Sequence, residues 1–177
     1  VGDARGLHHA RHLSALDAGT IVAVCDIVAS AAERSAAQLG AAAYTDYEKF
    51  LRHGMDLVII ATPDTLHAQQ AAQALEAGVG VVSEVPAATT VDDARRLVQA
   101  YRKAGGFYML LENYGYRDEN ELIRRMVQAG QFGDVYFGEG EYLHDCRGLN
   151  RFPDGSFTWR GRSFSGYVYI WHSLRPL

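Results

Sequence analysis

The stretch Val79-Gly80-Val81-Val82-Ser83-Glu84-Val85-Pro86 is the most informative in this chain, because an apolar run ends there in a carboxylate and a rigid proline. A short apolar run of this kind is typical of a strand buried in a parallel sheet. Ligands bind outside the carboxyl ends of such strands, so Glu84 stands where a ligand-binding side chain is expected. Val85, between the acid and the proline, has no proton to offer to a reaction.

Segments of strand and helical character alternate on both sides of this stretch. Short apolar runs predict strands, and helical stretches that end at glycine predict helices. The predicted strands cover residues 21–25, 56–61, 79–83 and 107–111, and the predicted helices cover 29–39, 47–52, 66–77, 90–103 and 117–129. Such alternation is typical of βαβ units, so we predict an α/β fold built on a Rossmann-type doubly wound parallel sheet.

The pattern changes at Val135, where a period-two alternation rich in Gly and Tyr runs to His144 and predicts a strand. We expect this strand to belong to a second α/β domain with an open sheet. We assign residues 1–113 to a Rossmann domain and 114–177 to the incomplete beginning of a substrate domain. The Rossmann domain would need a central strand before Gly2, so we interpret the chain as truncated at its N-terminus.

Composition excludes several classes of function. The 177 residues are 48% hydrophobic, 21% charged and carry a formal charge of −4, without a clustered basic stripe, so we expect no nucleic-acid partner. Cys25 and Cys146 lie far apart and outside any metal-ligand spacing, so we predict neither a disulfide framework nor a metal site. No apolar stretch approaches the roughly 20 residues that cross a bilayer, so we expect no membrane span.

The N-terminal segment carries a glycine turn ahead of a helical stretch, with Gly2, Arg5 and Gly6 as its candidate cofactor-binding residues. Such a turn can bring backbone N–H groups against a pyrophosphate, although an ordinary turn is an open alternative here. Asp26 ends an apolar strand 20 residues after Gly6, where a dinucleotide fold places an acid on the ribose hydroxyls. A carboxylate there favours NAD over NADP, and helix capping is the alternative role.

Three motifs together resemble the Gfo/Idh/MocA oxidoreductases, which pair an NAD(P)-binding Rossmann domain with a C-terminal α/β domain. They are Ala61-Thr62-Pro63-Asp64-Thr65-Leu66-His67, Glu84-Val85-Pro86 and Gly130-Gln131-Phe132-Gly133-Asp134-Val135. The resemblance implies bound NAD and hydride transfer on a sugar or cyclitol. It adds Thr62, Pro63, His67, Glu84 and Pro86 to the cofactor-binding residues, with a solvent-exposed position as the alternative for His67. Most members have lysine where this chain has Val85.

A narrower resemblance is to the NAD-dependent α-N-acetylgalactosaminidase branch of this family, which commonly has the valine. The segments that carry it are Glu84-Val85-Pro86-Ala87-Ala88, Met109-Leu110-Leu111-Glu112-Asn113, Glu141-Tyr142-Leu143-His144-Asp145-Cys146-Arg147 and Tyr169-Ile170-Trp171-His172-Ser173-Leu174-Arg175-Pro176. The resemblance implies Glu112, Tyr142, Tyr169 and His172 as catalytic residues, with Tyr169 as the base. A redox-assisted glycoside hydrolase that recycles NAD is therefore the alternative function. A non-catalytic NAD-binding fragment is a further one.

Several assignments keep a structural alternative. Tyr142 is open to a packing role in a strand, and Glu112 to a capping role for the helix that follows. Arg147 and Trp159 are candidate wall residues of a sugar pocket. His8, His9 and His12 have no supporting acid in the sequence, so we treat them as surface or pyrophosphate-side residues.

The expected partner is a small sugar-like molecule, and we expect a homo-oligomer at full length. A cytoplasmic location is favoured, while the start without Met leaves an export signal open. We expect the isolated 177 residues to be inactive.

Overall fold

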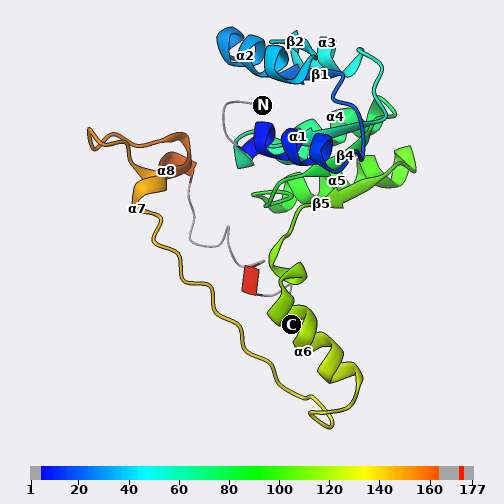
Figure 1. The fold of residues 1–177 in the computed structure, drawn as a ribbon, viewed down its shortest axis with the longest axis vertical. Coiled ribbons are helices and arrows are strands. Elements are labelled where there is room, and N and C mark those ends of the chain that lie inside the picture. The colour runs from blue at the N-terminus through cyan, green and yellow to red at the C-terminus, as the bar shows by residue number, and fades with distance from the viewer. Residues whose placement is uncertain (1–4, 164–171, 174–177) are drawn as a thin grey trace. The chain divides into compact units, whose positions relative to one another are not determined.

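The computed structural model describes residues 5–163 and 172–173 (Figure 1). The chain divides into two compact units, Val1–Leu110 and Leu111–Leu177. This division falls three residues before the domain boundary expected from the sequence, which stays a prediction. Each unit is described by itself.

The first unit alternates helices and short strands through its whole length. In chain order its elements are α1 (Arg5–Ala15), β1 (Ala23–Cys25), α2 (Ala29–Leu39), β2 (Ala42–Tyr44), α3 (Tyr47–Leu51), β3 (Leu57–Ile60), η1 (Asp64–Leu66), α4 (His67–Glu76), β4 (Gly80–Ser83), α5 (Val91–Ala104) and β5 (Tyr108–Leu110). The four predicted strands correspond to β1, β3, β4 and β5, and four of the five predicted helices correspond to α2, α3, α4 and α5. The strand β2 was not predicted, because its three residues lack the β-branched run that signals a strand.

Every strand pair in the described part of the chain is parallel. β1 pairs with β2, and β3, β4 and β5 form a second sheet in that order. In the second sheet Ile60 aligns with Ser83, and Ser83 with Leu110. The three strands therefore end at one edge, which is where Glu84 and the turn after β3 emerge.

The core of the first unit lies between α4 and the β3–β4–β5 sheet. Small alanines on the inner face of α4 let the helix approach the sheet closely, and Val81 at the centre of β4 is fully buried. The core cluster consists of Phe50, Val58, Ile60, Ala68, Ala71, Ala72, Ala74, Leu75, Val79, Val81, Leu97 and Ala100. This apolar packing makes the strand ends a rigid support for the side chains that follow them.

Helix ends follow their local sequence. Thr90 begins α5 by accepting a hydrogen bond from the Asp93 N–H at 3.1 Å, and Gly105 ends it in the left-handed region at φ 63°. Gly40 ends α2 in the same way at φ 66°. The helix stops predicted at these glycines are confirmed.

The second unit contains η2 (Tyr114–Tyr116), α6 (Asp118–Gln128), α7 (Arg147–Asn150) and α8 (Trp159–Ser163). The strand predicted over 135–144 is wrong for this structure, because the segment forms no β ladder within the described residues. Tyr136 in this segment is 98% exposed. Alternation alone does not form a strand, because a strand needs a neighbouring strand to pair with.

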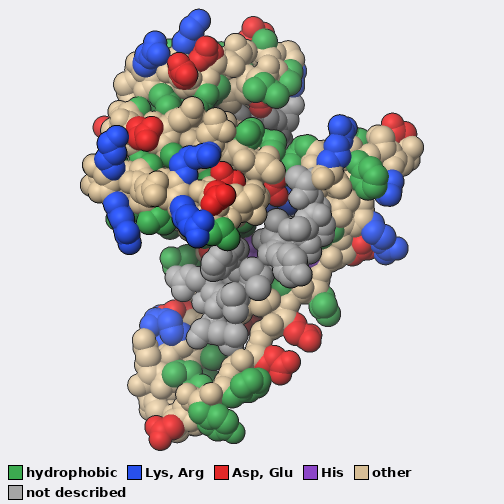
Figure 2. All heavy atoms as spheres, turned by 180° about the vertical axis from the view of Figure 1, so that it is seen from behind, with side chains coloured by type: hydrophobic (Ala, Val, Ile, Leu, Met, Phe, Trp, Pro, Cys, Tyr) green, Lys and Arg blue, Asp and Glu red, His purple; other side chains and the backbone are tan. Residues whose placement is uncertain are grey.

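Charged side chains of both signs are interspersed on the face that Figure 2 shows. Lys and Arg do not gather there into a single stripe, in keeping with the formal charge of −4. No helix among the described residues has the length and apolar character needed to cross a membrane.

Candidate functional site

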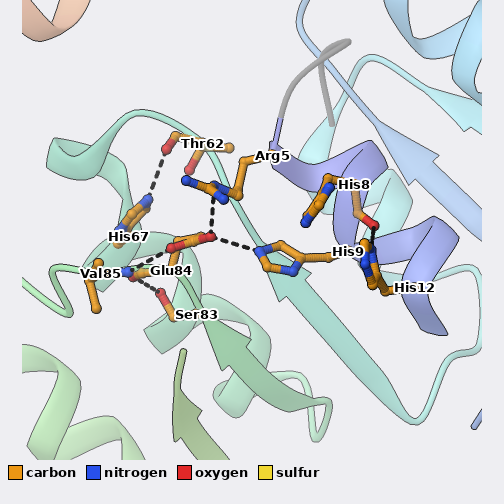
Figure 3. Close-up of polar contacts among 9 residues, drawn as sticks. All are labelled: Arg5, His8, His9, His12, Thr62, His67, Ser83, Glu84 and Val85. Atoms are coloured by element: carbon orange, nitrogen blue, oxygen red, sulfur yellow. Dashed lines mark hydrogen bonds and ion pairs between the residues drawn. The ribbon is translucent and has the colours of Figure 1, made fainter. Parts of the chain in front are cut away.

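Two side chains of α1 reach Glu84 at the carboxyl end of β4 (Figure 3). His9 Nε2 lies 2.7 Å from Glu84 Oε1, and Arg5 Nε lies 3.3 Å from the same oxygen. Arg5 is 65% exposed, whereas His9 is 23% and Glu84 16% exposed. The shorter and better buried contact with His9 is therefore the stronger one.

These contacts act on the ionisation of Glu84. Its partial burial opposes ionisation, but the hydrogen bond from His9, the charge of Arg5 and the Val85 N–H together hold the pKa of Glu84 below its ordinary value. Glu84 is thus an anion at neutral pH. Its Oε2 accepts a long, 3.3 Å hydrogen bond from the Val85 N–H, which leaves lone pairs for a hydroxyl donor.

His67 joins the two loops that follow β3 and β4. Its Nδ1 lies 2.8 Å from the Pro86 carbonyl oxygen, and its Nε2 lies 2.8 Å from the Thr62 carbonyl oxygen. The side chain is 2% exposed, so the solvent-exposed alternative for His67 is wrong. Because α4 begins at His67, the helix holds both loops at the edge of the sheet where ligands bind in α/β folds.

The turn between β3 and α4 places Thr62 and Pro63 beside His67. The Thr62 hydroxyl donates to Gln70 Oε1 at 2.6 Å and does not cap the short helix that follows. Pro63 instead occupies the position before η1. Pro86 is buried in the next loop. Both loops are thus held by side chains of α4.

Asp26 follows β1 at the carboxyl end of the other sheet. Its backbone N–H donates to the Tyr44 carbonyl, and its Oδ1 accepts from the Val28 N–H at 2.9 Å. This Asx turn leads into α2 and leaves the side chain partly exposed. A turn role and a ribose-binding role both agree with this position.

The remaining predicted residues of the N-terminal turn lie at the start of α1. Gly6 is buried in the first turn of this helix, and Arg5 begins it. Gly2 lies outside the described residues.

In the second unit, Glu112 and His172 form a buried pair. His172 Nδ1 lies 2.9 Å from Glu112 Oε1, and the Tyr114 N–H donates to the same oxygen at 2.8 Å. Glu112 is 4% and His172 8% exposed. Glu112 Oε2 is buried and has no hydrogen-bond partner among the residues that the structure describes. A carboxylate bound to Nδ1 fixes the imidazole tautomer that carries its proton there.

Two tyrosine rings pack around His172. The ring centroids of Tyr114 and Tyr142 lie 4.5 and 4.7 Å from that of the imidazole. The structure therefore brings together three of the four predicted catalytic residues, Glu112, Tyr142 and His172. The fourth, Tyr169, lies outside the described residues.

Arg147 and Trp159 each contact a side chain close to them in the sequence. Arg147 forms a bidentate pair with Asp145, with a shortest distance of 2.7 Å. The Arg160 Cζ lies 4.8 Å from the centroid of the Trp159 ring. The Arg147 side chain is 91% exposed, and Trp159 is 44% exposed. Within residues 5–163 and 172–173, His, Cys, Asp and Glu side chains form no group of three that could hold a metal ion.

His9 is the residue that sequence reasoning missed. The local sequence offers no supporting acid for the three histidines of the N-terminal helix. In the structure Glu84 is the acid that contacts His9. The two residues are 75 positions apart, and no local pattern connects them. Only the packing of α1 beside the sheet brings them together.

Comparison with known proteins adds independent findings. The family model described as "Oxidoreductase family, NAD-binding Rossmann fold" matches residues 1–111. A glycosyl hydrolase family 109 protein from Saccharopolyspora erythraea is 37% identical over 89% of this chain and 38% of its own length. A second one, from Shewanella pealeana, is 30% identical over 98% of this chain and 41% of its own length. The chain thus spans about two fifths of the curated relatives it matches.

Among solved structures, the WlbA dehydrogenase from Bordetella pertussis, in complex with NADH and UDP-GlcNAcA, is similar to this chain. It matches with a TM-score of 0.69 at 28% identity, over 73% of this chain and 41% of that protein. The WlbA dehydrogenase from Chromobacterium violaceum, also with NADH and UDP-GlcNAcA, matches with a TM-score of 0.67 at 30% identity, over 73% and 38%.

Proposed function

Because the chain belongs to the Gfo/Idh/MocA oxidoreductase family with its NAD-binding Rossmann fold, we propose that the full-length protein is an NAD-dependent oxidoreductase acting on a sugar or cyclitol by hydride transfer. The observation that carries the proposal is the family match over residues 1–111, which spans the ionised Glu84 at the carboxyl edge of the β3–β4–β5 sheet.

The residues of the first unit fit a dinucleotide. The partly exposed carboxylate of Asp26 can accept hydrogen bonds from ribose hydroxyls, and the exposed guanidinium of Arg5 can face a phosphate. Glu84 offers a second, half-buried hydroxyl acceptor. The proposed cofactor-binding set is Gly2, Arg5, Gly6, Asp26, Thr62, Pro63, His67, Glu84 and Pro86. Asp26 would repel a 2′-phosphate, so NAD is preferred over NADP.

NAD, when bound, accepts the hydride of a carbinol C–H bond. The chain must supply a base for the O–H proton, because the carbinol loses a hydride and a proton as it becomes a carbonyl group. We propose Tyr169 as that base, with His172 three positions after it in the sequence. Tyr142 and Glu112 complete the proposed catalytic set. The buried Glu112–His172 hydrogen bond supports a defined orientation of the imidazole.

The substrate class is proposed from relatives. The two WlbA dehydrogenases are described with NADH and UDP-GlcNAcA, a sugar nucleotide. A small sugar-like substrate therefore suits the present chain, and we propose residues 114–177 as the beginning of the domain that binds it. A homo-oligomeric assembly stays part of this proposal.

A redox-assisted glycoside hydrolase is the second candidate, favoured by the glycosyl hydrolase family 109 relatives and by Val85. In that reaction a sugar transiently oxidised at C3 has an acidic C2 proton. A base of the chain removes this proton, the C1–O bond to the aglycone breaks, and water adds to the resulting double bond. Reduction at C3 then restores the sugar, so NAD is recycled and no net oxidation occurs.

The test uses the full-length protein with NAD and two substrate sets. With free sugars and cyclitols, accumulation of NADH supports the dehydrogenase. With an aryl α-N-acetylgalactosaminide, release of the aryl group without accumulation of NADH supports the hydrolase. Either activity should be lost in Tyr169→Phe. A protein that binds NAD but shows neither activity is the non-catalytic alternative, and one that binds no NAD contradicts the whole proposal.

A further inference from the structure

We propose that His9 is a positioning residue that holds one oxygen of Glu84 in place, so that the other oxygen accepts a hydrogen bond from a hydroxyl group of the bound cofactor. This inference rests on the proposed NAD binding. It concerns a residue of α1 that does not belong to the proposed cofactor-binding set.

His9 and Glu84 are in direct contact. At 2.7 Å, the contact between His9 Nε2 and Glu84 Oε1 has the length of a charge-assisted hydrogen bond. A carboxylate only accepts, so Nε2 must carry the proton and the tautomer is settled by the contact. Figure 3 shows His9 reaching from α1 toward this oxygen. Glu84 loses the freedom to rotate while His9 holds Oε1.

The other carboxylate oxygen of Glu84, Oε2, makes a weaker contact within the chain. Oε2 accepts a 3.3 Å hydrogen bond from the N–H of the following residue, Val85, which orients it only weakly. With Oε1 occupied, Oε2 is the atom available to a ligand hydroxyl. The partial burial of Glu84 makes such a hydrogen bond stronger than it would be in water, provided that the carboxylate is ionised.

Other ionisable side chains of α1 lie near the contact between His9 and Glu84. Arg5 also contacts Glu84, but its guanidinium is largely exposed, so solvent screens its charge. His8 and His12 are two further histidines of α1, and the centroids of their rings lie 4.2 Å apart. Desolvation, followed by electrostatic interactions with His12, His9 and Arg5, lowers the pKa of His8, and the charge of Glu84 opposes this shift. His9 is the member of this group that faces the carboxylate at hydrogen-bond distance.

The test measures NAD dissociation constants of the full-length protein, without substrate, from pH 4 to 8. His9→Leu should weaken NAD binding about tenfold near pH 7, because a hydrogen bond to a charged group is lost. His9→Gln keeps a neutral N–H donor and should recover most of the affinity. His53→Leu is the matched control, since His53 contacts Tyr44 Oη at 2.8 Å rather than Glu84, and it should bind NAD as the unaltered protein does.

The pH profile separates positioning from a general structural role. Removal of His9 removes one of the causes that lower the pKa of Glu84, so that pKa should rise. Binding that needs ionised Glu84 should then fall off at a higher pH in His9→Leu than in the unaltered protein. Glu84→Gln should abolish this acid limb, which is the loss of NAD affinity as the pH falls. In the Glu84→Gln background, His9→Leu should cost little further affinity.

The inference is overturned if His9→Leu remains folded, as judged by its thermal unfolding, and shows unchanged affinity and an unchanged acid limb. It is also overturned if His9→Gln fails as badly as His9→Leu while both remain folded. If the inference is overturned in either way but the unaltered protein binds NAD, the proposed function is not contradicted. Absence of NAD binding by the unaltered protein contradicts both.

Discussion

The imidazole of His67 lies 2.8 Å from the carbonyl oxygen of Pro86, and its other nitrogen contacts the Thr62 carbonyl at the same distance. A side chain at the start of α4 therefore connects the loops that follow β3 and β4. With His9 on Glu84, the segment Glu84-Val85-Pro86 is held at both of its ends by residues from two different helices. Val85 is presented between two anchored neighbours.

His67→Ala should destabilise the first unit by about 2–3 kcal/mol, because the Pro86 and Thr62 carbonyl oxygens lose the imidazole that donates to one of them and contacts the other, and a buried ring is removed. Chemical denaturation of the full-length protein measures this change. Gln69→Ala, an exposed position on the same helix, is the control and should change stability by less than about 0.5 kcal/mol. Equal effects of the two substitutions would contradict the connecting role of His67.

Glu112→Leu should lower kcat about a hundredfold with a smaller change in KM, because it removes the acceptor that fixes the tautomer of His172. Steady-state kinetics on whichever substrate the full-length protein accepts measures both constants. Glu119→Leu replaces an exposed carboxylate that pairs with Arg117, and it should leave kcat unchanged. An effect of Glu112→Leu on KM alone would show that the pair serves binding and not chemistry.

Asp26→Asn should reduce the preference for NAD over NADP about tenfold, since it removes a negative charge that would repel a 2′-phosphate. Dissociation constants for both cofactors, measured on the full-length protein, give the ratio. Asp56→Asn is the control, because Asp56 is exposed and precedes β3, away from the carboxyl ends of the strands. If both cofactors weaken equally in Asp26→Asn, the acid acts through its turn at Val28 instead.

Thr90→Ala should destabilise the protein by about 1 kcal/mol, because the Asp93 N–H at the start of α5 loses its capping oxygen. Thr90→Ser keeps a hydroxyl acceptor and should recover most of this loss. Denaturant midpoints of the two variants provide the comparison. Indistinguishable midpoints for Thr90→Ala and the unaltered protein would show that the cap contributes nothing measurable.

Much of the first unit could be predicted from local sequence. Runs such as 57–60 and 79–83 are typical of strands in a parallel sheet, and Gly40 and Gly105 end helices because they adopt positive φ. The family match and the two similar dehydrogenases confirm the predicted Rossmann-type fold and its NAD-binding character. The residues assigned to the site remain predictions that the experiments above test.

The strand over 135–144 shows where local reasoning failed. Its alternation of glycine and tyrosine resembles a half-buried strand, but a strand requires a hydrogen-bonded neighbour that lies elsewhere in the chain. The pattern therefore indicated a tendency and could not establish the structure.

By itself the sequence determined the α/β class and the position of Glu84 after a buried strand. These features depend on the periodicity and turn chemistry of neighbouring residues, which act within a few positions along the chain. The tertiary structure alone decided that His9 holds Glu84, that His67 joins two loops and that Glu112 contacts His172. These three contacts join residues that are 75, 19 and 60 positions apart, so they form only when the chain has packed. The hydrophobic effect that drives packing is non-directional, so a local sequence pattern does not specify which distant residues meet.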